Sequence, residues 1–388
     1  MTEMVYGAAP APKGDPVIPR WWRTVDRWSL LCVLLLCAIG VLLGFAASPP
    51  LADRNGLPDF YYVQKQVIFG TMGIVALIAT SVLSPTGLRR WGVVGFVACL
   101  VALLLLPVFG SDFGMGAKRW YSLGFGSFQP SEFMKPCFVL VSAWFMAAAH
   151  QLGGPPGRAM SFGLAVILVG LLAAQPDFGQ AALIVFAWGV MYFVAGASWA
   201  ILFVVAGVVV AGGVAAYTSS DHFKSRIDGY LSTTIDPNSQ IGYAANAIRE
   251  GGIFGVGLGG GEVKTTLPDA HTDFIIAVAA EEYGLVLVMV IMVLFATIVL
   301  RSLARLVKER DPFVRIAATG LACMIGMQAA INMGVAVRLL PTKGMTLPFV
   351  SYGGSSIIAM GITVGALLAL TRVRPQGRIA DVFRRAET

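Results

Sequence analysis

Trp28-Ser-Leu-Leu-Cys-Val-Leu-Leu-Leu-Cys-Ala-Ile-Gly-Val-Leu-Leu-Gly-Phe-Ala-Ala47 is a run of twenty residues without a single charged side chain. At about 1.5 Å per residue, a helix of this length crosses a hydrocarbon layer roughly 30 Å thick. Nine more apolar stretches follow, so the sequence predicts an all-α polytopic membrane protein with about ten transmembrane helices. The predicted spans are 28–47, 66–83, 91–109, 133–150, 160–174, 180–196, 199–217, 275–300, 316–337 and 355–371.

The composition of the chain agrees with a lipid-embedded fold. Hydrophobic residues make up 57% of it and charged residues only 13%, against about 25% charged in soluble domains. The net charge of +7 is best explained by basic cytoplasmic loops and an acidic lipid surface rather than by nucleic-acid binding. The five cysteines all fall in apolar spans, so their spacing predicts neither a metal site nor a disulfide framework.

The distribution of basic residues predicts the orientation and the domain organisation. An even number of spans puts both termini on one side, and 17 of the 28 Lys and Arg residues then lie on that side. The positive-inside rule makes this side cytoplasmic. We therefore expect a cytoplasmic tail over 1–27, a transmembrane domain over 28–371 and a second cytoplasmic tail over 372–388. A large outer loop over 218–274 connects the seventh and eighth spans.

The first polar outer loop covers about 110–132. It contains Lys118 and Arg119, then Gln129 and Pro130, and we expect Ser131 to cap the next helix. Glu132 lies in the first turn and Lys135 three residues later, a spacing that brings the two side chains together. Two interpretations stay open at this point: a capped helix with one ion pair, or a group of cations that binds an anionic lipid headgroup.

Two other outer segments contain candidate polar residues. Gln175-Pro-Asp-Phe-Gly179 is a tight turn in which Asp177 either caps the following helix or contacts a ligand. Apolar and polar residues alternate at helical spacing over Gln240–Glu250, so this segment is expected to form a helix along the membrane surface. The glycine-rich segment 251–261 formally fits G-x-G-x-x-G, but no βαβ unit surrounds it, so we interpret it as flexible backbone near a lipid ligand.

Asp273 lies at the start of the eighth span, directly after His271 and Thr272. It could cap that helix, but a carboxylate at the rim of a low-dielectric cavity also suits a general base. Glu281 and Glu282 lie about 12 Å deeper along the same helix. Adjacent carboxylates at this depth are costly, so at least one should face a polar interior.

The last outer loop, 338–354, contains two prolines and several glycines, which prevent a simple helix. Such backbone at membrane depth is tolerated only inside protein or beside water. Lys343 is either a phosphate contact or a lysine that reaches to the interface, and Ser351 is a further candidate contact.

Five motifs occur in the order and spacing of a known family. They are Gly116-Ala-Lys-Arg-Trp with Gln129-Pro-Ser-Glu, Gln175-Pro-Asp-Phe-Gly, Pro268-Asp-Ala-His-Thr-Asp-Phe, Glu281-Glu-Tyr-Gly, and Pro341-Thr-Lys-Gly with Ser351-Tyr-Gly-Gly-Ser-Ser. Over residues 25–372 the chain resembles the SEDS family (shape, elongation, division, sporulation). Pro341-Thr-Lys-Gly resembles the division branch, the FtsW proteins, more than the elongation branch, the RodA proteins. Tyr243 and Ala244 depart from the family pattern, and so does Asp269.

The resemblance implies a peptidoglycan glycosyltransferase that polymerises lipid II during septal wall synthesis, at the outer face of the bacterial cytoplasmic membrane. It implies Asp273 as the essential catalytic carboxylate and a class B penicillin-binding protein of the FtsI type as partner. No cofactor is expected with certainty, although a divalent cation (Mg or Mn) could share the work. A lipid II flippase and a non-catalytic division scaffold remain as alternatives. The residues expected to bind substrate are Lys118, Arg119, Gln129, Ser131, Glu132, Lys135, Asp177, Gln240, His271, Thr272, Lys343 and Ser351.

Overall fold

The structure is a computed structural model that describes residues 17–111, 118–124, 126–151, 153–219, 221–232, 239–267, 270–341 and 344–373. Ten long helices in these ranges overlap the ten predicted spans, which confirms the all-α membrane fold. They are α2 (Arg27–Arg54), α3 (Tyr61–Val82), α4 (Pro85–Phe109), α5 (Pro130–Ala148), α6 (Gly157–Ala174), α7 (Phe178–Val194), α8 (Trp199–Ser219), α12 (Ile275–Leu306), α13 (Pro312–Ala336) and α14 (Gly354–Leu370).

Seven of these helices are long and apolar enough to cross a membrane on their own. Helices α7 and α14 are apolar but shorter, at 17 residues each. Helix α5 has 19 residues and carries Glu132 and Lys135 in its first two turns. Helices α5, α7 and α14 therefore depend more than the other seven on packing against neighbouring helices for their stability in the membrane.

Short elements complete the connections between the long helices. They are α1 (Val17–Thr24), α9 (Asp221–Leu231), α10 (Gln240–Gly251), α11 (Val263–Thr266), and a two-stranded antiparallel hairpin of β1 (Tyr121–Ser122) and β2 (Ser127–Phe128). Helix α10 confirms the helix expected over 240–250. Its N-cap residue is Ser239, whose hydroxyl accepts a hydrogen bond from the amide of Gly242 at 3.1 Å.

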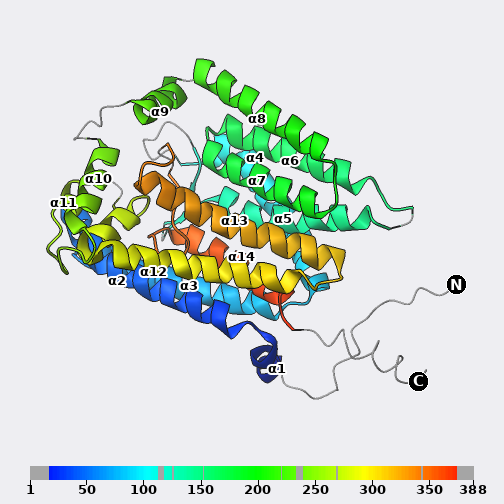
Figure 1. Cartoon of the computed structure of the whole chain (residues 1–388), viewed down its shortest axis with the longest axis horizontal. Coiled ribbons are helices and arrows are strands. Elements are labelled where there is room, and N and C mark those ends of the chain that lie inside the picture. Colours follow the sequence, from blue (N-terminus) through cyan, green and yellow to red (C-terminus); the bar gives the residue numbers. More distant parts are fainter. Residues whose placement is uncertain are drawn as a thin grey trace.

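The bundle has two distinct ends (Figure 1). Helices α9, α10 and α11 gather at one end, which we call the loop end, and α1 lies at the other, the terminal end. The amide of Val373 donates to the carbonyl of Thr24 at 3.1 Å, so both ends of the described chain lie at the terminal end, as an even number of spans requires. Helix α13 is the most buried of the long candidate spans, whereas α8 lies at the edge with none of its described side chains buried.

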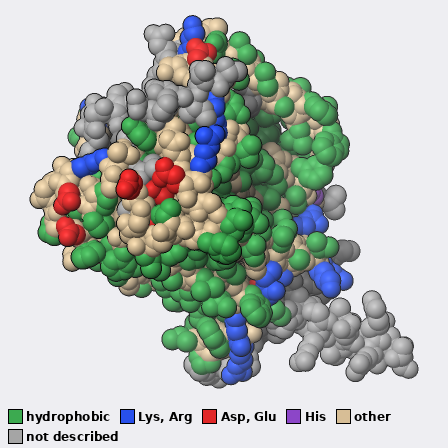
Figure 2. Space-filling view, turned by 60° about the vertical axis from the view of Figure 1, so that its left-hand side comes forward, with side chains coloured by type: hydrophobic (Ala, Val, Ile, Leu, Met, Phe, Trp, Pro, Cys, Tyr) green, Lys and Arg blue, Asp and Glu red, His purple; other side chains and the backbone are tan. Residues whose placement is uncertain are grey.

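The surface divides into an apolar flank and polar ends. In Figure 2 hydrophobic side chains cover much of the flank, and acidic and basic side chains gather on the face formed by the loop end. Large exposed apolar residues continue along the outward faces of α3 and α4, for example Val75, Val97 and Leu104. This pattern is typical of a protein whose flank is covered by lipid.

Helix α12 is broken at Gly284, which has φ 73° and ψ −174°. The break leaves four backbone groups without their helical partners, and residues 252–257 replace those partners. The amides of Val256 and Gly257 donate to the carbonyls of Glu281 and Glu282 at 2.9 and 3.1 Å. The amides of residues 285 and 286 donate to the carbonyls of Gly252 and Ile253 at 3.0 and 3.3 Å. Since buried backbone groups must be paired, the glycine-rich segment and α12 form one unit.

Part of the segment 251–261 has a packing role that the sequence did not predict. A Cβ atom on Gly255 would lie 2.1 Å from the carbonyl oxygen of Glu282, and one on Gly251 would lie 1.8 Å from that of Ala280. Gly251 and Gly255 thus allow the loop backbone to approach α12 closely, and the nearness of this segment to a lipid ligand stays a prediction. The side chains of Glu281 and Glu282 are both buried, and the Glu281 carboxylate lies against Gly261, so these acids face protein, as their depth requires.

At the terminal end, Asp26 connects α2 to α12. Its carboxylate accepts hydrogen bonds from Arg301 at 3.0 and 3.1 Å and from Ser29 at 2.8 Å, and it forms an ion pair with Arg305 at 3.0 Å. Burial raises the pKa of Asp26, but the hydrogen bonds from Arg301 and Ser29 and the charges of the two arginines outweigh it, so the pKa lies below its ordinary value of 3.8.

Replacing Asp26 with Asn should lower the free energy of unfolding by about 2 kcal/mol at pH 7, because two partly exposed arginines lose their buried acceptor. A carboxyl with a depressed folded pKa stabilises above pH 4 and loses this contribution as pH falls through the folded value. The difference between wild type and D26N should therefore shrink in acid. Thermal unfolding in detergent at several pH values measures it. The exposed Asp53, changed to Asn, is the control and should show no such difference.

Candidate functional site

Three buried carboxamides hold the connection between α13 and α14 inside the bundle. Gln328 donates to the carbonyl of Thr346 at 3.1 Å, and Asn332 donates to that of Met345 at 2.6 Å. Gln66 of α3 donates to the carbonyl of Val350 at 3.3 Å. Each of these side chains is at most 4% exposed. The prediction that this backbone survives only inside protein is confirmed, since side-chain amides replace the hydrogen bonds that water would otherwise provide.

The same connection fixes the segment that leads to Asp273. The hydroxyl of Ser351 donates to the carbonyl of Thr272 at 2.5 Å and accepts from the amide of Leu347 at 2.9 Å. The amide of Tyr352 donates to the carbonyl of His271 at 2.9 Å, and Asn332 donates to the carbonyl of Asp273 at 3.0 Å. The backbone of 271–273 is thus pinned at three consecutive carbonyls.

The carboxylate of Asp273 is half-buried and faces the α13–α14 connection. A Cβ atom on Gly344 would lie 3.2 Å from its Oδ2 atom, so the backbone of residue 344 forms one wall beside the carboxylate. Helix α12 begins at Ile275 with Phe274 in the N-cap position. Asp273 therefore does not occupy the capping position that the simpler interpretation of the sequence assigned to it.

An aromatic group lies beside this segment. The ring centroid of His271 is 5.5 Å from that of Tyr62 and 5.6 Å from that of Tyr352. Burial lowers the pKa of His271 to about 4 and raises that of Tyr352 to about 12, the latter helped by the neighbouring tyrosines. Both side chains are consequently neutral at pH 7. A charged group is thus provided here by Asp273 and not by these rings.

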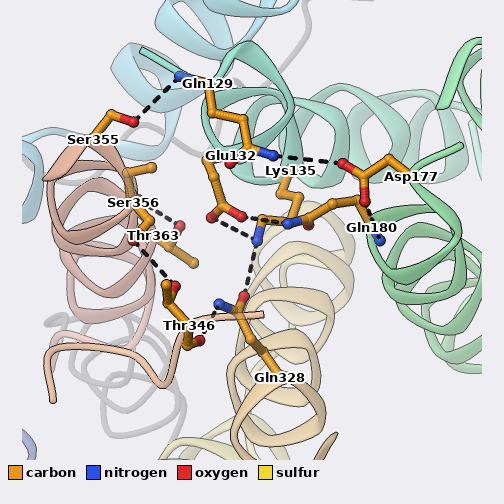
Figure 3. Close-up of polar contacts among 11 residues, drawn as sticks. Gln129, Glu132, Lys135, Asp177, Gln180, Gln328, Thr346, Ser355, Ser356 and Thr363 are labelled. Atoms are coloured by element: carbon orange, nitrogen blue, oxygen red, sulfur yellow. Dashed lines mark hydrogen bonds and ion pairs between the residues drawn. The ribbon is translucent and has the colours of Figure 1, made fainter. Parts of the chain in front are cut away.

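A second polar cluster lies at the start of α5 (Figure 3). Lys135 forms an ion pair with Glu132 at 2.8 Å and donates to Gln328 at 2.9 Å. Gln180 of α7 donates to the other carboxylate oxygen of Glu132. Figure 3 shows these side chains converging from α5, α7 and α13 toward one point. Because Gln328 and Asn332 are four residues apart on α13, about 6 Å along the helix, one helix face connects this cluster to Asp273.

Asp177, in the turn between α6 and α7, and Arg119, in the connection between α4 and α5, lie at the rim of this cluster. Arg119 donates to the carbonyls of Gln175 and Pro176 at 3.0 and 2.9 Å. Burial raises the pKa of Asp177, and this effect exceeds the opposing ones of the Arg119 charge and of the hydrogen bond from the Gln180 amide. Asp177 is the N-cap residue of α7, which confirms its predicted structural role.

The structure distributes the sequence-predicted site residues over both clusters. Gln129, Glu132, Lys135 and Asp177 belong to the α5 cluster, with Gln129 donating to Asp177 at 3.5 Å. His271, Thr272, Asp273 and Ser351 belong to the other. Lys118 is exposed and donates to the carbonyl of Pro107 at 3.2 Å. Gln240 is half-buried at the start of α10. Lys343 lies outside the described residues.

Two predictions at the start of α5 are corrected. The N-cap residue is Gln129, not Ser131, because Pro130 takes the first helical position, where its missing amide hydrogen costs nothing. Lys135 was expected to bind phosphate, but it is 2% exposed and its ammonium is directed at Glu132 and Gln328. Its role in this structure is to neutralise a buried carboxylate.

Sequence reasoning missed Gln180, Gln328, Asn332 and Gln66. A signal was available for two of them, since Gln328 and Asn332 are carboxamides at i and i+4 inside an apolar span. Polar residues at that spacing share one helix face and need a buried partner. No comparable pattern marked Gln66 or Gln180, because each is a single amide whose partner lies on another element.

The sequence was compared with known families and proteins. Residues 27–376 match the model of the FtsW, RodA and SpoVE group, described as a cell cycle protein. The chain is 43% identical, over 92% of its length and 91% of the relative's, to a protein of Caulobacter vibrioides named probable peptidoglycan glycosyltransferase FtsW. It is 33% identical, over 89% and 97%, to stage V sporulation protein E of Bacillus subtilis.

Solved structures give the same result for the fold. One is a chain from a peptidoglycan synthase complex described as coordinating polymerization and crosslinking, with a TM-score of 0.72 and 27% identity over 89% of this chain and 97% of that one. Another is the rod shape determining protein RodA of Thermus thermophilus, with a TM-score of 0.65 and 26% identity over 90% and 97%. The chain therefore belongs to the SEDS family, the FtsW, RodA and SpoVE group of multi-pass membrane proteins.

Proposed function

We propose that this protein is a peptidoglycan glycosyltransferase that polymerises lipid II. The observation that carries the proposal is Asp273, a carboxylate held beside the α13–α14 connection by backbone pinned at residues 271, 272 and 273. Rigid support of this kind is what a general base needs. The similarity to proteins named peptidoglycan glycosyltransferase supports the same reaction.

The proposed reaction joins two polyprenyl-linked disaccharides. Asp273 accepts the proton of the 4-hydroxyl of the acceptor GlcNAc as that oxygen attacks the anomeric carbon of the donor MurNAc. The bond from that carbon to the pyrophosphate oxygen breaks, and undecaprenyl pyrophosphate leaves with the bonding electron pair. Attack from the opposite face inverts the α-linked donor to a β-1,4 bond, and the proton on Asp273 passes to water.

The leaving pyrophosphate needs positive charge or hydrogen-bond donors. Lys118 is exposed on the loop end, and Arg119 lies close by, so these two cations remain candidates. Lys343 remains a candidate from its sequence position. The described residues contain no group of three His, Cys, Asp or Glu side chains arranged to hold a metal ion, and we assign no step to Mg or Mn.

Partner and location are part of the proposal. The relative found in a peptidoglycan synthase complex supports an FtsI-type class B penicillin-binding protein as partner. The loop end would face away from the cytoplasm, and the tails over 1–27 and 372–388 would lie inside the cell, close to the division septum. The α13–α14 connection and the backbone of residues 271–273 would then meet substrate from the outer leaflet.

The polymerase is tested by reconstituting the purified protein with its transpeptidase partner and fluorescently labelled lipid II. Glycan chains resolved by electrophoresis are the expected product. The flippase alternative predicts movement of the labelled headgroup across the bilayer with no polymer. The scaffold alternative predicts neither, and either of those results would contradict the proposal.

A further inference from the structure

Helix α1 lies where several long helices end, at the terminal end of the bundle (Figure 1). The indole nitrogen of Trp21 donates to the hydroxyl of Ser81, in the last turn of α3, at 2.8 Å. The carbonyl of Thr24 accepts from the amide of Val373, which follows the end of α14. Because the ends of membrane-spanning helices mark the boundary between hydrocarbon and water, these two hydrogen bonds hold α1 at that boundary.

The side chains of α1 divide into an apolar side and a basic side. Ile18 and Trp22 are four residues apart and so project from one side, where they are 74% and 48% exposed. Arg20 and Arg23, three residues apart, project from another side and are also exposed. In Figure 2 hydrophobic and basic side chains lie next to each other on the lowest part of the molecule, which is α1. This pattern is typical of a helix that lies in a membrane surface with its apolar side among the acyl chains.

The basic side has positive charge that the protein does not neutralise. Helix α1 contains no acid, and Asp26, which follows it, is buried in its own ion pairs. Within the part of the chain that the structure describes, neither Arg20 nor Arg23 forms an ion pair. Arg27 adds a third cation, and its guanidinium lies 5.2 Å from the ring centroid of Trp22. Cations grouped in this way at a membrane boundary attract an anionic headgroup.

The apolar side of α1 is accompanied by an exposed apolar face of α2. Trp28, in the first turn of α2, is 62% exposed. Leu31 and Leu35 follow it at helical spacing and are exposed as well, so this face continues into the flank of the bundle. An acidic protein segment would pair with the arginines but would leave these apolar side chains uncovered. A phospholipid covers both, since it has a charged headgroup and acyl chains.

We propose that α1 binds an anionic phospholipid of the leaflet at the terminal end. The phosphate lies beside Arg20, Arg23 and Arg27, and the acyl chains cover Ile18 and Trp22. The bound lipid stabilises the folded protein, because α1 has its place beside α3 and the end of α14 only in the folded state. This binding involves no turnover, so its measurement is independent of the reaction proposed above.

The location is tested with full-length protein in phosphatidylcholine nanodiscs that contain a small fraction of phosphatidylglycerol with a photoreactive acyl chain. Digestion with pepsin, whose cleavage does not depend on arginine, then identifies the labelled peptides. Peptides from 17–28 should be labelled several times more by this probe than by phosphatidylcholine with the same photoreactive chain. Equal labelling by the two probes would overturn the proposal, because any exposed apolar surface gives that result.

Affinity is tested with R20Q/R23Q, which removes two charges and keeps good helix formers at both positions. A cation near an anionic lipid surface contributes about fivefold in affinity, so this variant should bind phosphatidylglycerol about thirtyfold more weakly than wild type. Native mass spectrometry from an uncharged detergent measures the binding. The control is K308Q/R310Q, which removes two exposed cations from the α12–α13 connection and should bind like wild type. Unchanged binding by R20Q/R23Q, or equal weakening in both variants, would contradict the proposal.

Thermal unfolding in the same detergent tests whether the lipid stabilises the fold. Phosphatidylglycerol should raise the Tm of wild type and of K308Q/R310Q, and it should raise that of R20Q/R23Q by less than half as much. Phosphatidylcholine at the same concentration should have a smaller effect on all three proteins. An equal rise in all three proteins with phosphatidylglycerol would show that the lipid acts elsewhere on the bundle, which contradicts a site on α1.

The apolar side is tested with I18S, which changes an exposed residue and should leave the fold intact. This variant should bind phosphatidylglycerol at least about fivefold more weakly, because fewer apolar groups meet the acyl chains. Soluble polyglutamate should not displace phosphatidylglycerol from wild type. Displacement by polyglutamate, together with undiminished binding by I18S, would identify an acidic protein segment as the natural occupant and would overturn the proposal.

Discussion

The D273N protein is expected to fold and insert normally but to polymerise lipid II at least about a thousandfold more slowly than wild type. A positioned general base contributes roughly 10² to 10⁴ in rate, and an amide cannot accept the proton. Stability should change little, because Asn332 donates to the backbone carbonyl of residue 273 and Gly344 lies beside its side chain. An asparagine at this position keeps both the carbonyl and the side-chain size. Electrophoresis of glycan products and thermal unfolding of the same preparation measure the two effects.

The geometry around Asp273 also predicts that a longer carboxylate will not replace it. Gly344 already approaches the Oδ2 atom closely, so D273E should push its carboxylate out of position and restore little activity. Asp59 is exposed in the α2–α3 connection, and D59N should polymerise like wild type. Wild-type rates in D273N would remove this carboxylate from the mechanism.

The second large effect is expected from K135M, which should lower the free energy of unfolding by about 3 to 5 kcal/mol. The change leaves Glu132 buried with its cation removed and leaves Gln328 Oε1 without its donor. Breaking one half of a buried ion pair costs more than the pair itself contributes. Unfolding in detergent, followed by heat or by SDS titration, measures the loss.

A double variant identifies the cause of that loss. Replacing Glu132 by Gln in the K135M background removes the buried charge, so K135M/E132Q should recover at least half of the lost stability. The exposed Lys308, changed to Met, should be neutral. A K135M protein as stable as wild type would show that Glu132 is already uncharged in the native protein, which contradicts the ion pair described here.

The apolar spans were predictable because lipid imposes a simple requirement on each segment independently. A helix in hydrocarbon must satisfy its own backbone, so length and hydropathy alone identify it. The N-cap role of Asp177 was predictable for a similar reason, because capping involves only residues that are neighbours in sequence. The burial of the α13–α14 connection also followed from its prolines and glycines.

Features that depend on partners distant in sequence could not be predicted. The break at Gly284 requires residues 252–257, and the burial of Lys135 requires Gln328 from a helix nearly two hundred residues later. The roles of Gln66 and Gln180 depend on elements that only the folded bundle brings close. The sequence identified Asp273 but not the scaffold that orients it, because that scaffold is assembled from α3, α13 and the α13–α14 connection.

The break in α12 has a mechanical consequence. Residues 281 and 282 on one side of the break and residues 285 and 286 on the other are tied by backbone hydrogen bonds to the loop-end segment 252–257. A binding protein that pulls on α10 would therefore load both pieces of α12 at the break, where this segment replaces the helix's own hydrogen bonds. Tension applied outside the membrane would bend the helix at this point and move its short piece, with Asp273 just before its start, relative to the longer one.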